Sequence, residues 1–379
     1  MTETDPHRRP QRIYILTGEP SGEAHAARVV DALRAEWPDV EVRGMGGDAM
    51  EKAGVELVEH VSNTAIMGFA EVLSRLGFIR KLFARVQADI LAFRPDRILI
   101  VDYPGFNLRM AKWAHGQEIP VDMYIGPQVW AWKRKRVHAM ARNLDRLSVI
   151  LPFEPASYAG LNLDVDYVGH PLLDRKAVPA PTPSESASWK MAHGLSPEAQ
   201  VLALLPGSRP QEIQRMLPVF LKAAESKSEL VPVIAGAPGR SIRDYPTDVP
   251  VLFGQTSALY RHAKAGLVTS GTATLEAALA GMPQVVAYRT STLTYALARA
   301  FSRVRFISLV NLILDREAVP ERIQGRCTAG ILARALEDIL SPEGAEEHRA
   351  HQDRLRSALG SAGASEKVAR SLMRPLTRS

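Results

Sequence analysis

The stretch VLALLPGSRPQEI at residues 201–213 carries the pattern that decides the fold. Its five leading apolar residues are enough for a strand that is buried on both faces of a parallel sheet. Gly207 then permits a tight turn, and Pro210 suits the first turn of a helix. Ser208 stands three residues before Gln211, a capping-box spacing that predicts where this helix begins. Strand, turn and helix in this order predict an α/β fold.

The same alternation of short apolar runs and longer amphipathic segments extends over most of the chain. A shift to Pro and Ser at residues 176–197 divides it into two halves. We therefore expect two doubly wound, Rossmann-like domains that face a cleft, at residues 1–180 and 181–340. Helices at residues 341–379 would pack back on the first domain or exchange with a partner chain. The predicted strands are residues 13–17, 40–44, 97–102, 121–125, 147–151, 165–168, 201–205, 230–235, 249–253, 266–269 and 284–288.

Composition narrows the class of protein. The 379 residues include 47 Lys and Arg against 41 Asp and Glu, a formal net charge of +6. Apolar residues at 46% and charged residues at 23% are typical of a soluble globular chain and exclude wholesale disorder. A single cysteine, Cys327, excludes a disulfide framework and a multi-cysteine metal site. No apolar run is long enough to span a bilayer, and residues 1–12 lack a signal peptide's apolar stretch, so we expect a cytoplasmic protein.

Ligands of doubly wound folds bind beyond the carboxyl ends of the strands, so the residues after each strand are the binding candidates. Gly207, Ser208 and Arg209 follow the first strand of the second half, where helix N–H groups and a guanidinium would cradle a diphosphate. An ordinary capped helix with a surface arginine is the equal alternative. The P-loop pattern is absent, which disfavours an ATPase of that class.

A second strand-to-helix corner, TSGTATLE at residues 269–276, places small and hydroxylated residues at another helix start. Its hydroxyl donors would suit a sugar diphosphate, and its carboxylate would accept hydrogen bonds from ribose hydroxyls. Simple helix capping by Ser or Thr is the alternative. The candidate residues of this corner are Ser270, Gly271, Thr272, Thr274 and Glu276.

Two residues of the first half are candidates for a general base. Asp102 ends a predicted strand and would take a proton from a hydroxyl nucleophile in the cleft. Capping of the next helix is the alternative, and the residue pattern alone favours it. His170 has an unperturbed pKa near neutrality, but a histidine between Gly and Pro is more often structural.

Two glycine-rich segments follow the first two predicted strands. TGEPSGE at residues 17–23 forms a corner after the first strand. GMGGDA at residues 44–49 loosely satisfies the dinucleotide fingerprint, but it follows the second strand and lacks an acidic residue at the expected spacing. Nicotinamide binding is therefore disfavoured.

Residues 130–136 read WAWKRKR and place two tryptophans beside four consecutive basic residues. Tryptophan favours a membrane interface, and each basic residue near an anionic surface adds about 1 kcal/mol of attraction. A solvated basic helix start is the alternative. Nucleic-acid binding is disfavoured because no helix-turn-helix, RNP or zinc-finger pattern accompanies the run. The residues assigned to this membrane patch are Trp130, Trp132, Lys133, Arg134, Lys135 and Arg136.

Ten short motifs in a fixed order make the chain similar to the lipid-A-disaccharide synthases, which are inverting glycosyltransferases of the two-domain B fold. The resemblance covers residues 13–324, most of the chain. The motifs are GEPSG (18–22), MGFAEVL (67–73), DYPGFN (102–107), VWAW (129–132), LPFEP (151–155), VGHP (168–171), LPGSR (205–209), SGTATLE (270–276), SLVN (308–311) and VPERIQ (319–324).

The resemblance implies a reaction between two acylated sugars. UDP-2,3-diacylglucosamine would donate its sugar to the 6-hydroxyl of 2,3-diacylglucosamine 1-phosphate, giving the β-1,6 lipid A disaccharide 1-phosphate and UDP. No metal or other cofactor is expected. The enzyme would be cytoplasmic and peripherally associated with the anionic inner-membrane surface, with no nucleic-acid partner. A homodimer is left open.

The resemblance also implies roles for single residues. Asp102 would be the general base, and His170 would inherit that role if Asp102 lacked it. Arg209 would contact the diphosphate, and Glu276 would bind ribose. The remaining assignments are Asn311 to uracil or diphosphate, and Glu19 and Ser21 to the acceptor or donor-sugar pocket.

Two alternatives come from other classes of protein. A UDP-sugar epimerase on the same fold would also bind UDP, but it would change the sugar without an acceptor. A non-catalytic nucleotide-sugar or RNA-binding protein would use the basic run and leave the strand-end motifs unexplained.

Overall fold

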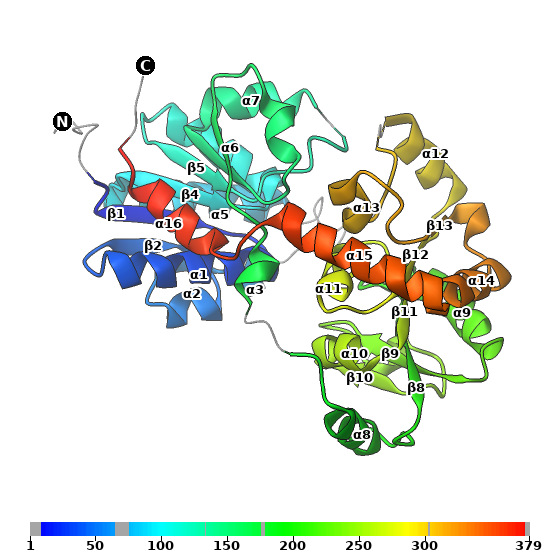
Figure 1. Ribbon diagram of the computed structural model, residues 1–379. Helices are drawn as coiled ribbons and strands as arrows, with labels where there is room; N and C mark the ends of the chain where they lie inside the picture. The colour runs from blue at the N-terminus through cyan, green and yellow to red at the C-terminus, as the bar shows by residue number, and fades with distance from the viewer. Residues whose placement is uncertain (1–8, 65–75, 133, 176–178, 302–303, 376–379) are drawn as a thin grey trace. The chain divides into compact units, whose positions relative to one another are not determined.

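Two units, each built on one parallel sheet with helices on both faces, make up the chain (Figure 1). The structure, a computed structural model, describes residues 9–64, 76–132, 134–175, 179–301 and 304–375. Unit 1 comprises residues 1–176 and 361–379, and unit 2 comprises residues 177–360. The predicted α/β, doubly wound fold class is confirmed.

The sheet of unit 1 has seven strands, and its central strand β4 (Arg97–Val101) is buried at every residue. Helices α1 (Pro20–Glu36) and α16 (Ala364–Met373) cover one face. Helices α5 (Leu76–Phe93), α6 (Pro104–His115) and α7 (Arg136–Asn143) cover the other. Across the sheet the order is β3 (Glu56–His60), β2 (Glu41–Gly46), β1 (Arg12–Leu16), β4, β5 (Val121–Tyr124), β6 (Arg146–Val149) and β7 (Asp164–Tyr167).

The sheet of unit 2 has six strands. One face packs on α9 (Pro210–Glu225) and α14 (Ala329–Leu340). The other packs on α8 (Pro183–Ala192), α10 (Thr256–His262) and α11 (Thr272–Leu279). Across the sheet the order is β10 (Val251–Phe253), β9 (Leu230–Gly236), β8 (Gln200–Leu205), β11 (Ala265–Thr269), β12 (Gln284–Tyr288) and β13 (Glu321–Ile323). The remaining α-helices among the described residues are α2 (Asp48–Lys52), α3 (Val61–Thr64), α12 (Thr292–Phe301), α13 (Leu309–Leu314) and α15 (Pro342–Leu359).

Each sheet has one point at which the strand order reverses. In unit 1 the chain runs outward from β1 through β2 to β3 and then resumes at β4 on the other side of β1. In unit 2 the same reversal lies between β8 and β11. Helices on opposite faces leave a crevice at such a switch point, beyond the carboxyl ends of the two strands. The corners that the sequence predicted follow these four strands, β1 and β4 in unit 1 and β8 and β11 in unit 2.

The C-terminal helices at residues 341–379, for which we expected packing on the first domain or exchange with a partner chain, are divided between the two units. Helix α15 packs on α11, α13 and α14 of unit 2, whereas α16 packs along α1 of unit 1. The boundary between the two halves falls at residue 176 instead of 180. No helix within the described residues is long and apolar enough to cross a bilayer.

Helix α16 is held at both of its ends. Asp174 accepts three successive backbone N–H groups at 2.8–3.1 Å, those of Gly363, Ala364 and Ser365. At the other end, the buried Arg97 donates to the carbonyl of Leu372 at 2.5 Å, and the buried Arg146 donates to that of Ser371 at 2.6 Å. A negative charge at the helix start and positive charges at its end both suit the helix dipole.

Two edge strands, β3 and β13, were not predicted from the sequence. β3 reads ELVEH and pairs with one neighbour only, so most of its side chains stay partly exposed. β13 has three residues and forms the edge of the unit 2 sheet next to β12. Neither has the continuous apolar run that marks a central strand.

Candidate active site

The corner after β8 forms a tight turn into α9. Gly207 has φ +112°, and a Cβ there would lie 2.6 Å from the Cβ of Glu212, so only glycine fits. The helix begins at Pro210 with Arg209 as its N-cap residue. The predicted capping box of Ser208 with Gln211 is wrong by one residue. Pro210 occupies the first helical position, and Glu212 therefore stands where a side chain reaches back to the helix start.

Glu212 occupies the hydrogen-bond donors of this corner. Its Oε2 accepts the backbone N–H groups of Ser208 at 3.1 Å and Arg209 at 3.2 Å. Its Oε1 lies 3.6 Å from the guanidinium of Arg209. The Arg209 side chain remains 80% exposed, and Ser208 is exposed as well. The corner therefore presents a positive charge to solvent beside N–H groups that a carboxylate already holds.

The corner after β11 is only partly available for a ligand. Thr274 is buried and its Oγ1 donates to the carbonyl of Gly271 at 2.8 Å, so it shapes the helix start. Ser270 donates to the carbonyl of Ile307 at 2.9 Å. Thr272 and Gly271 are exposed, and a Cβ at Gly271 would meet no atom within 4 Å. The space above Gly271 is therefore open.

Glu276 is half-buried one turn into α11. The hydroxyl of Tyr260 donates to its Oε2 at 3.4 Å. A neighbouring phenol therefore orients the Glu276 carboxylate.

The two corners of unit 2 lie side by side. β8 and β11 are parallel neighbours, and Leu205, the last residue of β8, pairs with Val268, one residue before the end of β11. The exposed residues that follow, Arg209 on one corner and Thr272 on the other, belong to the same edge of the sheet. The structure therefore brings together two candidate residues, Arg209 and Thr272, that are 63 positions apart in the sequence.

Asn311 lies within a network of internal hydrogen bonds, and its contact with uracil or diphosphate stays a prediction. It is fully buried, and its amide donates to the carbonyl of Val319 and to Oε1 of Glu321, both at 2.8 Å. Its oxygen accepts the N–H groups of Ala318 and Val319 at 2.7 and 2.9 Å. Four internal hydrogen bonds use the full capacity of an amide, so Asn311 shapes the loop before β13.

Asp102 follows β4 in a constrained backbone. Asp102 and Tyr103 have φ values of +48° and +49°, a left-handed conformation that is uncommon outside glycine and that recurs at functional sites. The N-cap residue of α6 is Tyr103, without a side-chain hydrogen bond, so the alternative that Asp102 caps this helix is not what the structure shows. Burial raises the pKa of the Asp102 carboxyl, and a hydrogen bond from the Tyr103 backbone partly opposes this.

Asn107 holds the two strands of the unit 1 switch point together. It is fully buried, and its amide donates to the carbonyls of Leu16 at 3.3 Å and Asp102 at 2.8 Å. Leu16 ends β1 and Asp102 follows β4, so one side chain spans both carboxyl ends. The position of Asp102 is fixed by this bridge.

The glycine-rich corner after β1 lies against Asp102. A Cβ at Gly18 would lie 2.1 Å from Cδ1 of Tyr103, and a Cβ at Gly22 would lie 3.7 Å from the Cβ of Asp102. Glu19 and Ser21 are exposed between these two glycines. This edge of unit 1 therefore gathers a half-buried carboxylate, a tyrosine and two exposed polar residues.

His170, the alternative candidate for the general base, lies inside unit 1. It is 4% exposed, and its Nδ1 accepts the N–H of Leu172 at 3.2 Å, which caps the short 3₁₀ helix Pro171–Asp174. Burial, and then the neighbouring His25, lower the pKa of His170 to about 4. His170 thus caps a short helix, in line with the structural alternative stated for it, and its role as a substitute base stays a prediction.

The tryptophans of the membrane patch differ in their surroundings. Trp130 is half-buried; its Nε1 donates to Glu154 at 3.2 Å, and its ring meets Phe153 edge to face. Trp130 therefore joins two motifs within unit 1. Trp132 is 49% exposed, with the guanidinium of Arg136 5.8 Å from its ring centroid.

Beside Trp132, Arg134 and Lys135 are exposed. Lys133 and the motif at residues 67–73 lie outside the described residues.

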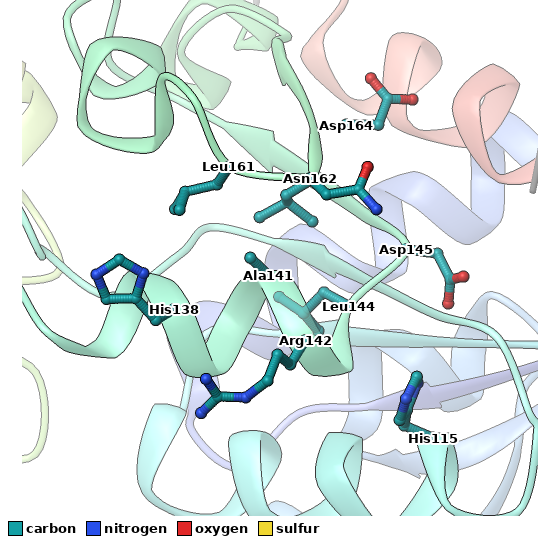
Figure 2. Close-up of a pocket in the computed structure, with 10 residues that line it drawn as sticks. His115, His138, Ala141, Arg142, Leu144, Asp145, Leu161, Asn162 and Asp164 are labelled. Atoms are coloured by element: carbon teal, nitrogen blue, oxygen red, sulfur yellow. The ribbon is translucent and has the colours of Figure 1, made fainter. Parts of the chain in front are cut away.

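A hollow of about 730 Å³ lies away from these corners (Figure 2). It is next to the amino ends of β6 and β7, where Asp145 accepts the N–H of Val121 at 2.9 Å and Asp164 pairs with Arg146 at 3.3 Å. In Figure 2, His138 and His115 stand on opposite sides of the hollow. Its charged groups do not converge on one point, and it lies at the opposite edge of the sheet from Asp102.

Sequence reasoning missed Glu212 and Tyr103. Proline at position 210 was a signal for Glu212, because a helix that begins with Pro210 has its third residue at 212. No local signal marked Tyr103, since its packing over Gly18 depends on the adjacency of β1 and β4. Within the described residues, no group of three or more His, Cys, Asp or Glu side chains is arranged to hold a metal ion.

Comparison with known proteins gives the family. A family model described as lipid-A-disaccharide synthetase matches residues 13–372. The lipid-A-disaccharide synthase of Myxococcus xanthus is 37% identical over 377 residues, which cover 96% of this chain and 97% of that protein. The lipid-A-disaccharide synthase of Syntrophus aciditrophicus is 37% identical over 370 residues, which cover 94% and 96%.

Solved structures with the same fold include transferases and epimerases. The glycotransferase of kitacinnamycin matches with a TM-score of 0.62 at 16% identity, over 97% of this chain and 100% of that chain. The UDP-GlcNAc 2-epimerase of Neisseria meningitidis, bound to UDP-GlcNAc, matches with a TM-score of 0.63 at 13% identity, over 95% and 99%. These likenesses show the fold alone, because one fold hosts several chemistries.

Proposed function

The chain belongs to the lipid-A-disaccharide synthase family, and from this premise we propose how its two units share the reaction. It is a glycosyltransferase that makes the lipid A disaccharide from a nucleotide sugar and a lipid acceptor. The donor is UDP-2,3-diacylglucosamine, and the acceptor is 2,3-diacylglucosamine 1-phosphate. The products are the β-1,6 disaccharide 1-phosphate and UDP.

Unit 2 binds the UDP part of the donor. The observation that carries this proposal is the pair of corners at the switch point of β8 and β11, where the exposed Arg209 and the open space above Gly271 belong to one edge. A guanidinium matches the geometry of phosphate oxygens in two hydrogen bonds. Thr272 adds a hydroxyl donor, and Glu276 accepts from the ribose.

Unit 1 binds the acceptor, and Asp102 acts as the general base. The 6-hydroxyl gives its proton to the Asp102 carboxylate while its oxygen attacks the anomeric carbon of the donor. The bond from that carbon to the diphosphate oxygen breaks, and UDP leaves with the electron pair. A pKa raised by burial supports this role, because a base is most effective when its pKa approaches the working pH. Glu19 and Ser21 line the same edge and contact sugar hydroxyls.

The charge on the departing diphosphate is offset by the protein in this proposal. Arg209 and the helix starts of α9 and α11 supply positive potential where the leaving oxygen becomes negative. No metal ion is required. Full activity in excess chelator is the expected result, and activity that returns only when a divalent cation is added back would contradict it.

A surface of unit 1 attaches the enzyme to the anionic face of the inner membrane. Trp132, Arg134, Lys135 and Arg136 carry this part of the proposal, because they combine an exposed indole with adjacent positive charges. A cytoplasmic enzyme with such a surface reaches acylated substrates that stay in the bilayer.

Binding of UDP by calorimetry tests the donor assignment. Arg209→Ala is expected to weaken UDP binding about 10- to 100-fold, the value of one charge-assisted interaction. Arg334→Ala removes another exposed arginine, on α14, and serves as the control. Equal UDP affinity in both variants would refute the assignment.

A further inference from the structure

The donors at the start of α9 are already engaged by a carboxylate of the same helix. Oε2 of Glu212 accepts from Ser208 and Arg209, and Oε1 faces the Arg209 guanidinium. A diphosphate at this corner needs the same N–H groups and the same guanidinium. Glu212 therefore stands in the place of an anion.

Burial and packing show that this arrangement is built into the corner. The Glu212 side chain is 18% exposed, in contrast to 80% for Arg209. Gly207 leaves the gap that Glu212 fills, since a Cβ at Gly207 would lie 2.7 Å from Oε2 of Glu212. Loss of the glycine would push the carboxylate off the N–H groups. The loop and the carboxylate are thus fitted to one another.

Charge makes the two anions competitors. A carboxylate and a diphosphate that share one guanidinium and two N–H groups repel each other at short range. A carboxylate that stays nearby also replaces the diphosphate's hydrogen bonds as UDP leaves. Its net effect on the donor site is weaker binding of UDP and faster release.

We propose that Glu212 is a positioning residue that acts as an internal competitor of the donor diphosphate: it holds the 207–209 loop ready in the empty enzyme, limits UDP affinity and speeds UDP release. This inference rests on the proposed binding of the diphosphate by Arg209. Glu212 acts through the loop and Arg209 and takes no part in bond formation.

Glu212→Gln tests the proposal, because glutamine keeps the shape and one acceptor oxygen but removes the charge. UDP affinity is expected to rise about five- to tenfold, with a matching fall in the UDP dissociation rate in stopped-flow displacement. Glu225→Gln makes the same charge change at the exposed last residue of α9 and should leave both values within about twofold of the wild type. Glu212→Ala is expected to act in the same direction and serves if the glutamine variant misfolds.

Thermal unfolding with and without UDP separates this role from simple helix capping. If Glu212 only caps α9, its replacement lowers the Tm by the same amount in both conditions and leaves UDP affinity unchanged or weaker, which would overturn the proposal. The proposal predicts a larger UDP-induced rise in Tm for Glu212→Gln than for the wild type.

Arg209→Ala distinguishes the two levels of the argument. If this variant binds UDP as tightly as the wild type, the diphosphate does not bind at this corner and the donor assignment fails. If it loses affinity while Glu212→Gln and Glu225→Gln behave alike, the donor assignment stands and only the competitor role of Glu212 is refuted.

Discussion

Replacement of Asp102 by asparagine should separate catalysis from stability. Asparagine has the same shape and tolerates the left-handed backbone at φ +48° better than other residues, so the corner should keep its structure. Asparagine cannot take the proton of the acceptor hydroxyl. Removal of a general base costs about 10²- to 10⁴-fold in turnover, which is about 3–5 kcal/mol of transition-state free energy.

The same substitution should raise the free energy of unfolding at neutral pH. Burial raises the folded-state pKa of Asp102 above its ordinary value of 3.8. The unfolded chain then ionises first as pH rises, so the wild type loses stability from about pH 3.8 upward until the folded carboxyl is ionised too. Asparagine never ionises, so its advantage should be absent below pH 3.8 and full near pH 7.

The assay pairs UDP release with urea unfolding at pH 3 and pH 7. Asp39→Asn, an exposed aspartate before β2 at the amino edge of the same sheet, is the control and should match the wild type in both measurements. Near-wild-type turnover by a folded Asp102→Asn enzyme would refute the base assignment. Lower stability of that variant at pH 7 would refute the argument from burial.

Three further predictions concern the scaffold and the surface. Asp174→Ala should lower the free energy of unfolding of unit 1 by about 2–3 kcal/mol in urea, because three N–H groups of α16 lose a charged acceptor. Asp31→Ala on the exposed side of α1 is the control, and equal unfolding midpoints for the two variants would contradict this role of Asp174. Gly18→Ala should lower the free energy of unfolding by about 1–3 kcal/mol and remove most of the activity, because the new Cβ would displace the Tyr103 ring. A Tm and a turnover equal to those of the wild type would show that this contact is unimportant. Joint replacement of Arg134 and Lys135 by serine should weaken the free energy of binding to anionic vesicles by about 1 kcal/mol per charge, measured by co-sedimentation. Unchanged co-sedimentation at low salt would refute the membrane assignment.

Local pattern was sufficient for the central strands and for the corners that follow them. The runs that became β4, β8 and β11 are short, apolar and followed by turn residues, and these signals lie within ten residues of one another. Edge strands such as β3 mix polar and apolar residues because only one neighbour pairs with them, so their pattern resembles a loop.

Tertiary contacts decided which motif residues face a ligand. Asn311 is a binding candidate in its own motif, and its hydrogen-bond partner Glu321 comes ten positions later. Trp130 donates to Glu154 from a motif 24 residues away, which gives this surface candidate a structural contact that its own motif did not indicate. The adjacency of the corners at Arg209 and Gly271 required the strand order, because β9 and β10 intervene in the sequence but not in the sheet.

The most direct test of the assigned reaction is UDP release from UDP-2,3-diacylglucosamine with and without 2,3-diacylglucosamine 1-phosphate, in excess chelator. The account predicts that UDP and the β-1,6 disaccharide 1-phosphate appear in equal amounts only when the acceptor is present. A change in the UDP sugar without acceptor, or UDP release that ignores the acceptor, would contradict it.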